Sequence, residues 1–186
     1  MKGDRGPPGP QEGGSVYTRW GRTVCPSVSG TEKVYDGYTA GTRSLDKGGG
    51  SNLICLTNNP RYASTYSAGG YSYIGAAEYE GSTVFKQNHN APCAVCTTTR
   101  IRHLMIPGTT QCPSGWTREY WGYLTSEHNG SHRTEFLCFD SSPQSIPGSA
   151  AHQLSSPEVW TVEANCDVLC PPYQANKVIT CVVCTK

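Results

Sequence analysis

Ten cysteines in 186 residues are the strongest constraint on what this chain can fold into. Their number is even, and hydrophobic residues make up only 36% of the chain, so loop-closing bridges would supply stability that the core alone lacks. Cytosolic thiols stay reduced, so this many cysteines indicates an oxidising, secretory compartment. We expect a secreted protein on this ground alone, because no signal peptide precedes the polar N-terminal residues. The cysteines are Cys25, Cys55, Cys93, Cys96, Cys112, Cys138, Cys166, Cys170, Cys181 and Cys184.

The cysteines repeat along the chain. Cys25-Pro26-Ser27 returns as Cys112-Pro113-Ser114, and the pair at 93 and 96 returns at 181 and 184. Cys55 corresponds to Cys138 at a similar offset. Such landmarks at nearly one spacing indicate two copies of one unit. We therefore predict tandem subdomains over residues 13–100 and 101–186, with Cys166 and Cys170 present in the second alone.

The local pattern favours strands. Residues 15–20, 117–121, 158–162 and 177–183 are rich in β-branched and aromatic side chains, and several alternate polar with apolar. Glycine, proline and asparagine clusters separate them, and no stretch shows a sustained helical period. The predicted fold class is all-β: two tandem disulfide-stapled β subdomains of similar topology.

The first twelve residues carry glycine at positions 3, 6 and 9 with prolines between them. Only glycine fits at the axis of a collagen triple helix, so residues 1–12 are predicted to be a short collagen-like segment that ends where Glu12 replaces glycine. A disordered tail rich in proline and glycine would fit the same letters. If the segment is collagen-like, three chains must meet at this end.

Charge and length exclude two classes of partner. Fifteen basic and fourteen acidic residues leave a net charge of +1, so no global field attracts nucleic acid. No apolar run approaches the roughly 18 residues that span a bilayer. We expect neither nucleic-acid nor membrane partners.

Catalytic and metal chemistry find little support in the sequence. Four thiolates from the two Cys-x-x-Cys pairs could hold zinc, but other cysteines are available as disulfide partners. A redox role for residues 93–96 needs a helix start, which the pattern does not indicate. Asn129-Gly130 between His128 and His132 favours a turn with solvated histidines. We expect no enzyme, no cofactor and no metal; the other histidines are His89, His103 and His152.

Two surface features remain. Asn129-Gly130-Ser131 makes Asn129 a candidate glycosylation site, although a lone sequon also arises by chance. Tyrosine offers a stiff contact surface with a polar tip, which suits a subunit interface or a sugar-stacking groove, while packing within the β domain is the alternative. The tyrosine-rich stretch contains the candidate interface residues Tyr62, Tyr66, Tyr71, Tyr73 and Tyr79.

The chain resembles the C-terminal region of invertebrate short-chain, spongin-type collagens, and more remotely the C-terminal non-collagenous domain of type IV collagen. The residues that carry the resemblance are 14–22, 93–96, 105–107, 112–117, 121–123 and 181–186, and the likeness covers the whole chain. It implies the pairing Cys25–Cys96, Cys55–Cys93, Cys112–Cys184, Cys138–Cys181 and Cys166–Cys170. The type IV domain has the last, small loop in both halves, so its absence from the first half here is a departure.

The resemblance also implies a function. It predicts an extracellular matrix structural protein whose head trimerises collagen-like chains as a homotrimer and mediates higher assembly, with other matrix proteins or glycans as further partners. The alternative is a recognition module on a collagen stalk, which binds glycans or microbial surfaces through clustered weak sites. A secreted enzyme is the third hypothesis.

Overall fold

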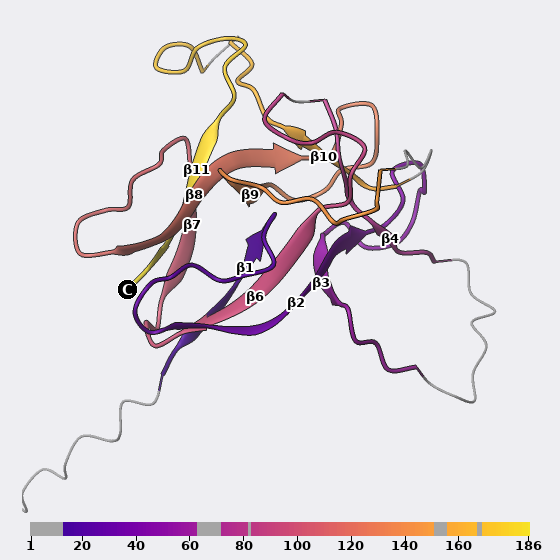
Figure 1. Ribbon diagram of the computed structural model, residues 1–186. Helices are drawn as coiled ribbons and strands as arrows, with labels where there is room; N and C mark the ends of the chain where they lie inside the picture. Colours follow the sequence, from indigo (N-terminus) through magenta and orange to yellow (C-terminus); the bar gives the residue numbers. More distant parts are fainter. Residues whose placement is uncertain (1–12, 63–71, 82, 151–155, 167–168) are drawn as a thin grey trace, which may run out of the picture.

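A computed structural model describes residues 13–62, 72–81, 83–150, 156–166 and 169–186. The predicted collagen-like segment lies outside the described residues, as do Tyr66, Tyr71 and His152. The prediction of an all-β chain is confirmed (Figure 1). The strands are β1 Ser15–Trp20, β2 Thr31–Gly41, β3 Ile54–Thr57, β4 Gly75–Ala76, β5 Glu78–Tyr79, β6 Pro92–Thr98, β7 His103–Pro107, β8 Thr117–Ser126, β9 Leu137–Asp140, β10 Glu158–Thr161 and β11 Thr180–Thr185.

The strands pair in the same order in both halves of the sequence. In the first half, β6 lies between β1 and β2, and β3 pairs with the far edge of β2. In the second half, β11 lies between β7 and β8, and β9 pairs with the far edge of β8. All six pairings are antiparallel. The central strands β6 and β11 are almost wholly buried, which explains their runs of cysteine, alanine and valine.

The registers agree as closely as the order does. Trp20 lies opposite Cys93 in the first half, and Pro107 lies opposite Cys181 in the second. Each half also has a bulge at the corresponding place, which leaves Val34 in β2 and Glu119 in β8 without a partner residue on the central strand. These registers align the two halves residue by residue.

The two halves nevertheless form one hydrogen-bonded sheet. Trp20 in β1 pairs with Phe139 in β9 in a parallel bridge, and β10 pairs with both β8 and β5. Two clusters of buried side chains fill the interior, and Trp20, Phe139, Tyr79 and Phe85 pack as rings in the first. Backbone pairing therefore continues across the boundary predicted at residue 100.

Five disulfides join the ten cysteines in the pairing that the resemblance implies. In each half, one bridge ties the central strand to the segment after the first strand and the other ties it to the short outer strand. All four cysteines of the Cys-x-x-Cys pairs are bridged to cysteines elsewhere, so none is a free thiolate that could bind zinc. No bridge joins the two cysteines of one pair, as a Cys-x-x-Cys redox centre would require. Five bridges indicate an oxidising, extracellular environment.

Candidate functional site

A junction of polar contacts lies where the two halves meet. The turn after β1, residues 21–23, is here called the first docking turn, and residues 141–144 after β9 are called the first docking loop. The amide of Gln144 donates to the carbonyl of Gly21 at 2.8 Å, and Gln144 Oε1 accepts from both the amide and the hydroxyl of Thr23 at 3.1 Å. Arg22 donates to the carbonyl of Ser142 at 2.8 Å. The loop is thus held through the backbone groups of Ser142 and Gln144 and through the Gln144 side chain.

Two further contacts fix this junction from the interior. The Tyr79 hydroxyl donates to the carbonyl of Gln144 at 3.0 Å, and Arg19 makes an ion pair with Asp140 at 2.7 Å. The side chains of Arg19 and Asp140 are only 13% and 4% exposed, so this pair is largely withdrawn from solvent. Gly21 has φ of +85°, the left-handed region that glycine adopts most readily, and this conformation forms the turn.

The second half contains a copy of the docking turn. Gly108 also has φ of +85°, and it donates its amide to Thr180 as Gly21 does to Pro92. Thr110 stands two residues after Gly108, as Thr23 does after Gly21. The hydroxyl of Tyr173 lies beside Gly108 as that of Tyr79 lies beside Gly21. We call residues 108–110 the second docking turn.

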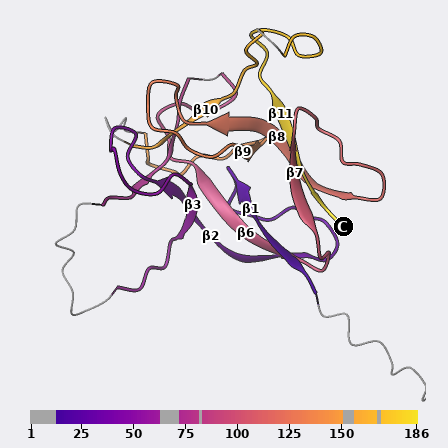
Figure 2. The same cartoon turned by 180° about the vertical axis from the view of Figure 1, so that it is seen from behind.

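The first half contains the corresponding copy of the docking loop. Residues 58–61 follow β3 as 141–144 follow β9, and Pro60 occupies the place of Pro143. Residues 58–62, which we call the second docking loop, are all exposed, and Tyr62 is 85% exposed. Figures 1 and 2 place β3 and β7 on opposite sides of the molecule, so the second loop does not reach the second turn of its own chain.

The predicted interface tyrosines differ in how far they are exposed to solvent. Tyr62 and Tyr73 are exposed, and Tyr73 stacks under the guanidinium of Arg43 at 4.5 Å. Tyr79 is only 1% exposed and belongs to the core, so the prediction is wrong for this residue. Its side chain supports the first docking turn from within. Sequence spacing did not distinguish it from its neighbours because burial here depends on β10, which pairs with β5 from far along the chain.

The remaining predicted sites lie apart from the junction. Asn129 is exposed in a turn, so its glycosylation stays a prediction. The same turn separates His128 and His132, as expected, and the His128 ring packs against Trp160 at an interplanar angle of 49°. Within the described part of the chain, no three histidine, cysteine or acidic side chains are grouped as metal ligands would be. The described residues also contain no helix long and apolar enough to cross a bilayer.

A polar hollow of about 390 Å³ lies between residues 42–51 and residues 127–134. Glu127 lines it and accepts hydrogen bonds from the amides of Glu158 and His128 at 2.9 and 3.1 Å. Burial, with a smaller effect of the nearby Glu158 charge, raises the pKa of Glu127 to about 7 although both amide bonds lower it. Glu127 is therefore protonated more readily in the folded chain than in the unfolded chain.

This shift predicts a loss of stability as pH rises. Because the folded pKa exceeds the usual 4.5, Glu127 contributes stability that is complete below about pH 4.5 and is lost as pH rises through 7. We expect Glu127→Gln to reduce the fall in unfolding free energy between pH 5 and 8, measured by urea denaturation. Glu32→Gln, at an exposed position of β2, is the control. Equal pH slopes for wild type and Glu127→Gln would contradict the assignment.

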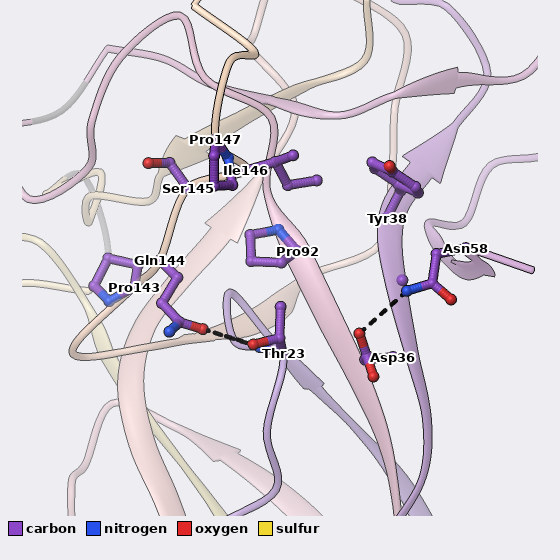
Figure 3. Close-up of a pocket in the computed structure, with 11 residues that line it drawn as sticks. Thr23, Asp36, Tyr38, Asn58, Pro92, Pro143, Gln144, Ser145, Ile146 and Pro147 are labelled. Carbon is purple, nitrogen blue, oxygen red and sulfur yellow. Dashed lines mark hydrogen bonds between the residues drawn. The ribbon is translucent and has the colours of Figure 1, made fainter.

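A second, larger cleft of about 600 Å³ borders the first docking turn (Figure 3). It is lined by β2, the start of β6, Thr23 and residues 143–147, so both halves contribute to it.

No model of a known protein family matches the chain.

Proposed function

We propose that this chain is the head of an extracellular matrix structural protein, and that three copies associate head to tail and bring three collagen-like segments together. The observation that carries the proposal is the second docking turn and the second docking loop, which one molecule cannot join to each other. Within the chain, the first pair of such elements already forms a stable junction. The second pair would form the same junction between neighbouring copies.

The side chains at the second junction support this proposal. The register places Ile106 of β7 where β1 has Arg19, and Thr57 of β3 where β9 has Asp140. Both members of the buried ion pair are thus replaced by uncharged residues, so closure would leave no unpaired charge at these two positions. Leu56 takes the place of Phe139 and is 40% exposed, whereas Phe139 is fully buried. Leu56 is therefore an exposed apolar side chain at a sheet edge, at the position where its counterpart Phe139 is buried.

The copy differs from the original in two ways. Pro107 stands at the position of Trp20 and has no amide hydrogen, so pairing with a neighbouring β3 would lack one backbone bond. Arg61 stands at the position of Gln144 and can only donate, so its partner on the second turn would be an acceptor such as Thr110 Oγ1. Turn and loop contacts would thus carry more of the second junction than strand pairing does.

Contacts of this kind join unlike surfaces, and they close into a ring or continue as a filament. The collagen-like repeat of residues 1–12 favours closure at three, because a collagen helix has three strands. Each trimer would then present six related units around one axis. Secretion into the matrix completes the proposal, and the five disulfides are suited to that environment.

The test introduces the charged residues of the first junction at the corresponding positions of the second. Thr57→Asp and Ile106→Arg should each place one unpaired charge at the closed junction and weaken association by about 2–5 kcal/mol, seen as a shift from trimer to monomer in light scattering. The double variant should recover the trimer, because it rebuilds the Arg19–Asp140 pair between copies. Leu45→Glu, at a position 68% exposed outside the junction, is the control and should remain trimeric. A monomeric wild type at micromolar concentration, or a double variant no better than the singles, would overturn the proposal.

A further inference from the structure

The cleft in Figure 3 combines an apolar floor with a polar wall. The half-buried Ile146 and the exposed Pro147 form the accessible floor, and Tyr38 stands at one side with 38% of its surface exposed. Asp36 and Asn58 lie together below Tyr38 in this view. A volume of about 600 Å³ falls within the range of small-ligand sites.

The polar wall retains unused hydrogen-bonding capacity. Asn58 Nδ2 donates to Asp36 Oδ2 at 3.4 Å, and Lys33 Nζ lies 2.6 Å from Asp36 Oδ1. A carboxylate has about four acceptor positions, so Asp36 can accept further bonds, and Asn58 Oδ1 remains an acceptor beside it. Lys33 offsets the carboxylate charge, so the wall as a whole carries no net charge. The geometry therefore suits an uncharged ligand with adjacent hydroxyl groups.

The apolar side of the cleft suits the other surface of such a ligand. A pyranose presents a face of C–H groups and an edge of hydroxyls, and a tyrosine ring offers a matching flat surface with a polar tip. The Tyr38 hydroxyl has no hydrogen-bond partner among the described residues. A proline-rich peptide would also contact proline and tyrosine, but it needs an aromatic-lined groove. Among the described residues that line this cleft, Tyr38 is the one aromatic side chain.

We propose that this cleft binds a neutral hexopyranose, which stacks on Tyr38 and donates adjacent hydroxyls to Asp36 and Asn58. This activity goes beyond the assembly role. Asn58 is the first residue of the second docking loop, so the test uses Asp36 and Tyr38, which belong to neither docking turn nor docking loop. If three heads associate, three such clefts would act together and raise the affinity for a glycan surface.

The test measures binding of methyl mannoside, methyl galactoside and N-acetylglucosamine to the oxidised full chain by saturation-transfer NMR and titration calorimetry. We expect at least one sugar to bind with a dissociation constant in the millimolar range, on the order of −4 kcal/mol. Asp36→Ala and Tyr38→Ala should each weaken that binding at least about tenfold, a loss of ~1.4 kcal/mol. Tyr73→Ala, at an exposed tyrosine outside the cleft, should bind as wild type does.

Two controls separate this proposal from the assembly proposal. Light scattering should give the same oligomeric state for the cleft variants as for wild type, and thermal unfolding should show that they fold. Absence of binding by all three sugars, or binding unchanged in both cleft variants, would overturn the saccharide site whatever the oligomeric state. Binding of a (Pro-Pro-Gly) repeat peptide that Tyr38→Ala abolishes, with no sugar binding, would overturn it in favour of a peptide site.

Discussion

Replacing Glu119 with alanine should lower the free energy of unfolding by about 3–5 kcal/mol, the cost of removing one partner from a buried ion pair. The Glu119 side chain is 0% exposed. It accepts hydrogen bonds from Arg100 at 2.5 Å, from Thr185 at 2.7 Å, from Tyr17 at 2.8 Å and from Thr31 at 3.0 Å. These donors come from both halves and from the last strand, so alanine would remove an acceptor from the buried hydroxyls of Tyr17 and Thr185 and from the half-buried Arg100 and Thr31.

The measurement is urea unfolding of the oxidised chain, followed by tryptophan fluorescence. Val34→Ala is the matched control, because Val34 occupies the same bulge position in the first half and is 57% exposed. It should change stability by no more than about 0.5 kcal/mol. A Glu119→Ala variant as stable as Val34→Ala would show that the carboxylate is not needed.

The pH dependence of the same variant gives an independent check. Burial raises the pKa of Glu119, but the bonds from Thr185, Arg100, Tyr17 and Thr31 outweigh burial and hold this pKa below its usual 4.5. Because its pKa is lower in the folded chain, the Glu119 carboxylate contributes stability that is complete above pH 4.5 and is lost as pH falls through the folded pKa. The stability difference between wild type and Glu119→Ala should therefore shrink in acid.

Much of the fold follows from local sequence pattern. Residues 15–20 alternate and contain β-branched and aromatic side chains, and they form β1 with the predicted bounds. The Cys-x-x-Cys segments are short apolar runs, which is typical of strands buried on both faces, and they form the central strands β6 and β11. The disulfide pairing came from the resemblance, since spacing alone permits many pairings of ten cysteines.

Neither the buried position of Glu119 nor the docking junction could be predicted from local pattern. Glu119 lies in a run whose alternation predicts a strand, but the bulge between Arg118 and Tyr120 shifts the register and turns the carboxylate inward. A bulge depends on the partner strand and leaves no local mark. The pairing of Arg19 with Asp140 joins residues 121 positions apart, and the parallel bridge beside it depends on how the two halves pack. Only the repeat, once aligned on the strand registers, could have pointed to Gly21 and Gly108.

Replacing Gly122 with alanine should be the second most damaging change. Gly122 lies in β8 opposite Asp140 of β9, and a Cβ built there would come within 1.6 Å of the carbonyl oxygen of Phe139. That oxygen belongs to the backbone, so relief requires β9 to move away from β8. Phe139 packs against Trp20 and Tyr79 in the core, so the movement would also disturb the aromatic cluster. We expect a loss of about 3 kcal/mol, at the upper end of the usual range for overpacking.

The repeat supplies a comparison for this prediction. Gly37 lies opposite Thr57 as Gly122 lies opposite Asp140, and its added Cβ would come within 1.9 Å of the carbonyl oxygen of Leu56. In the single chain β3 is an edge strand with Leu56 exposed, so it can shift more cheaply than β9. Urea unfolding of the monomer should therefore rank Gly122→Ala below Gly37→Ala in stability. Gly48→Ala, where an added Cβ meets nothing within 4 Å, should differ little from wild type. If the second junction closes in the trimer, β3 can no longer shift, and the loss of unfolding free energy caused by Gly37→Ala should rise toward that caused by Gly122→Ala. An unchanged loss in a demonstrated trimer would mean that β3 stays outside the contact.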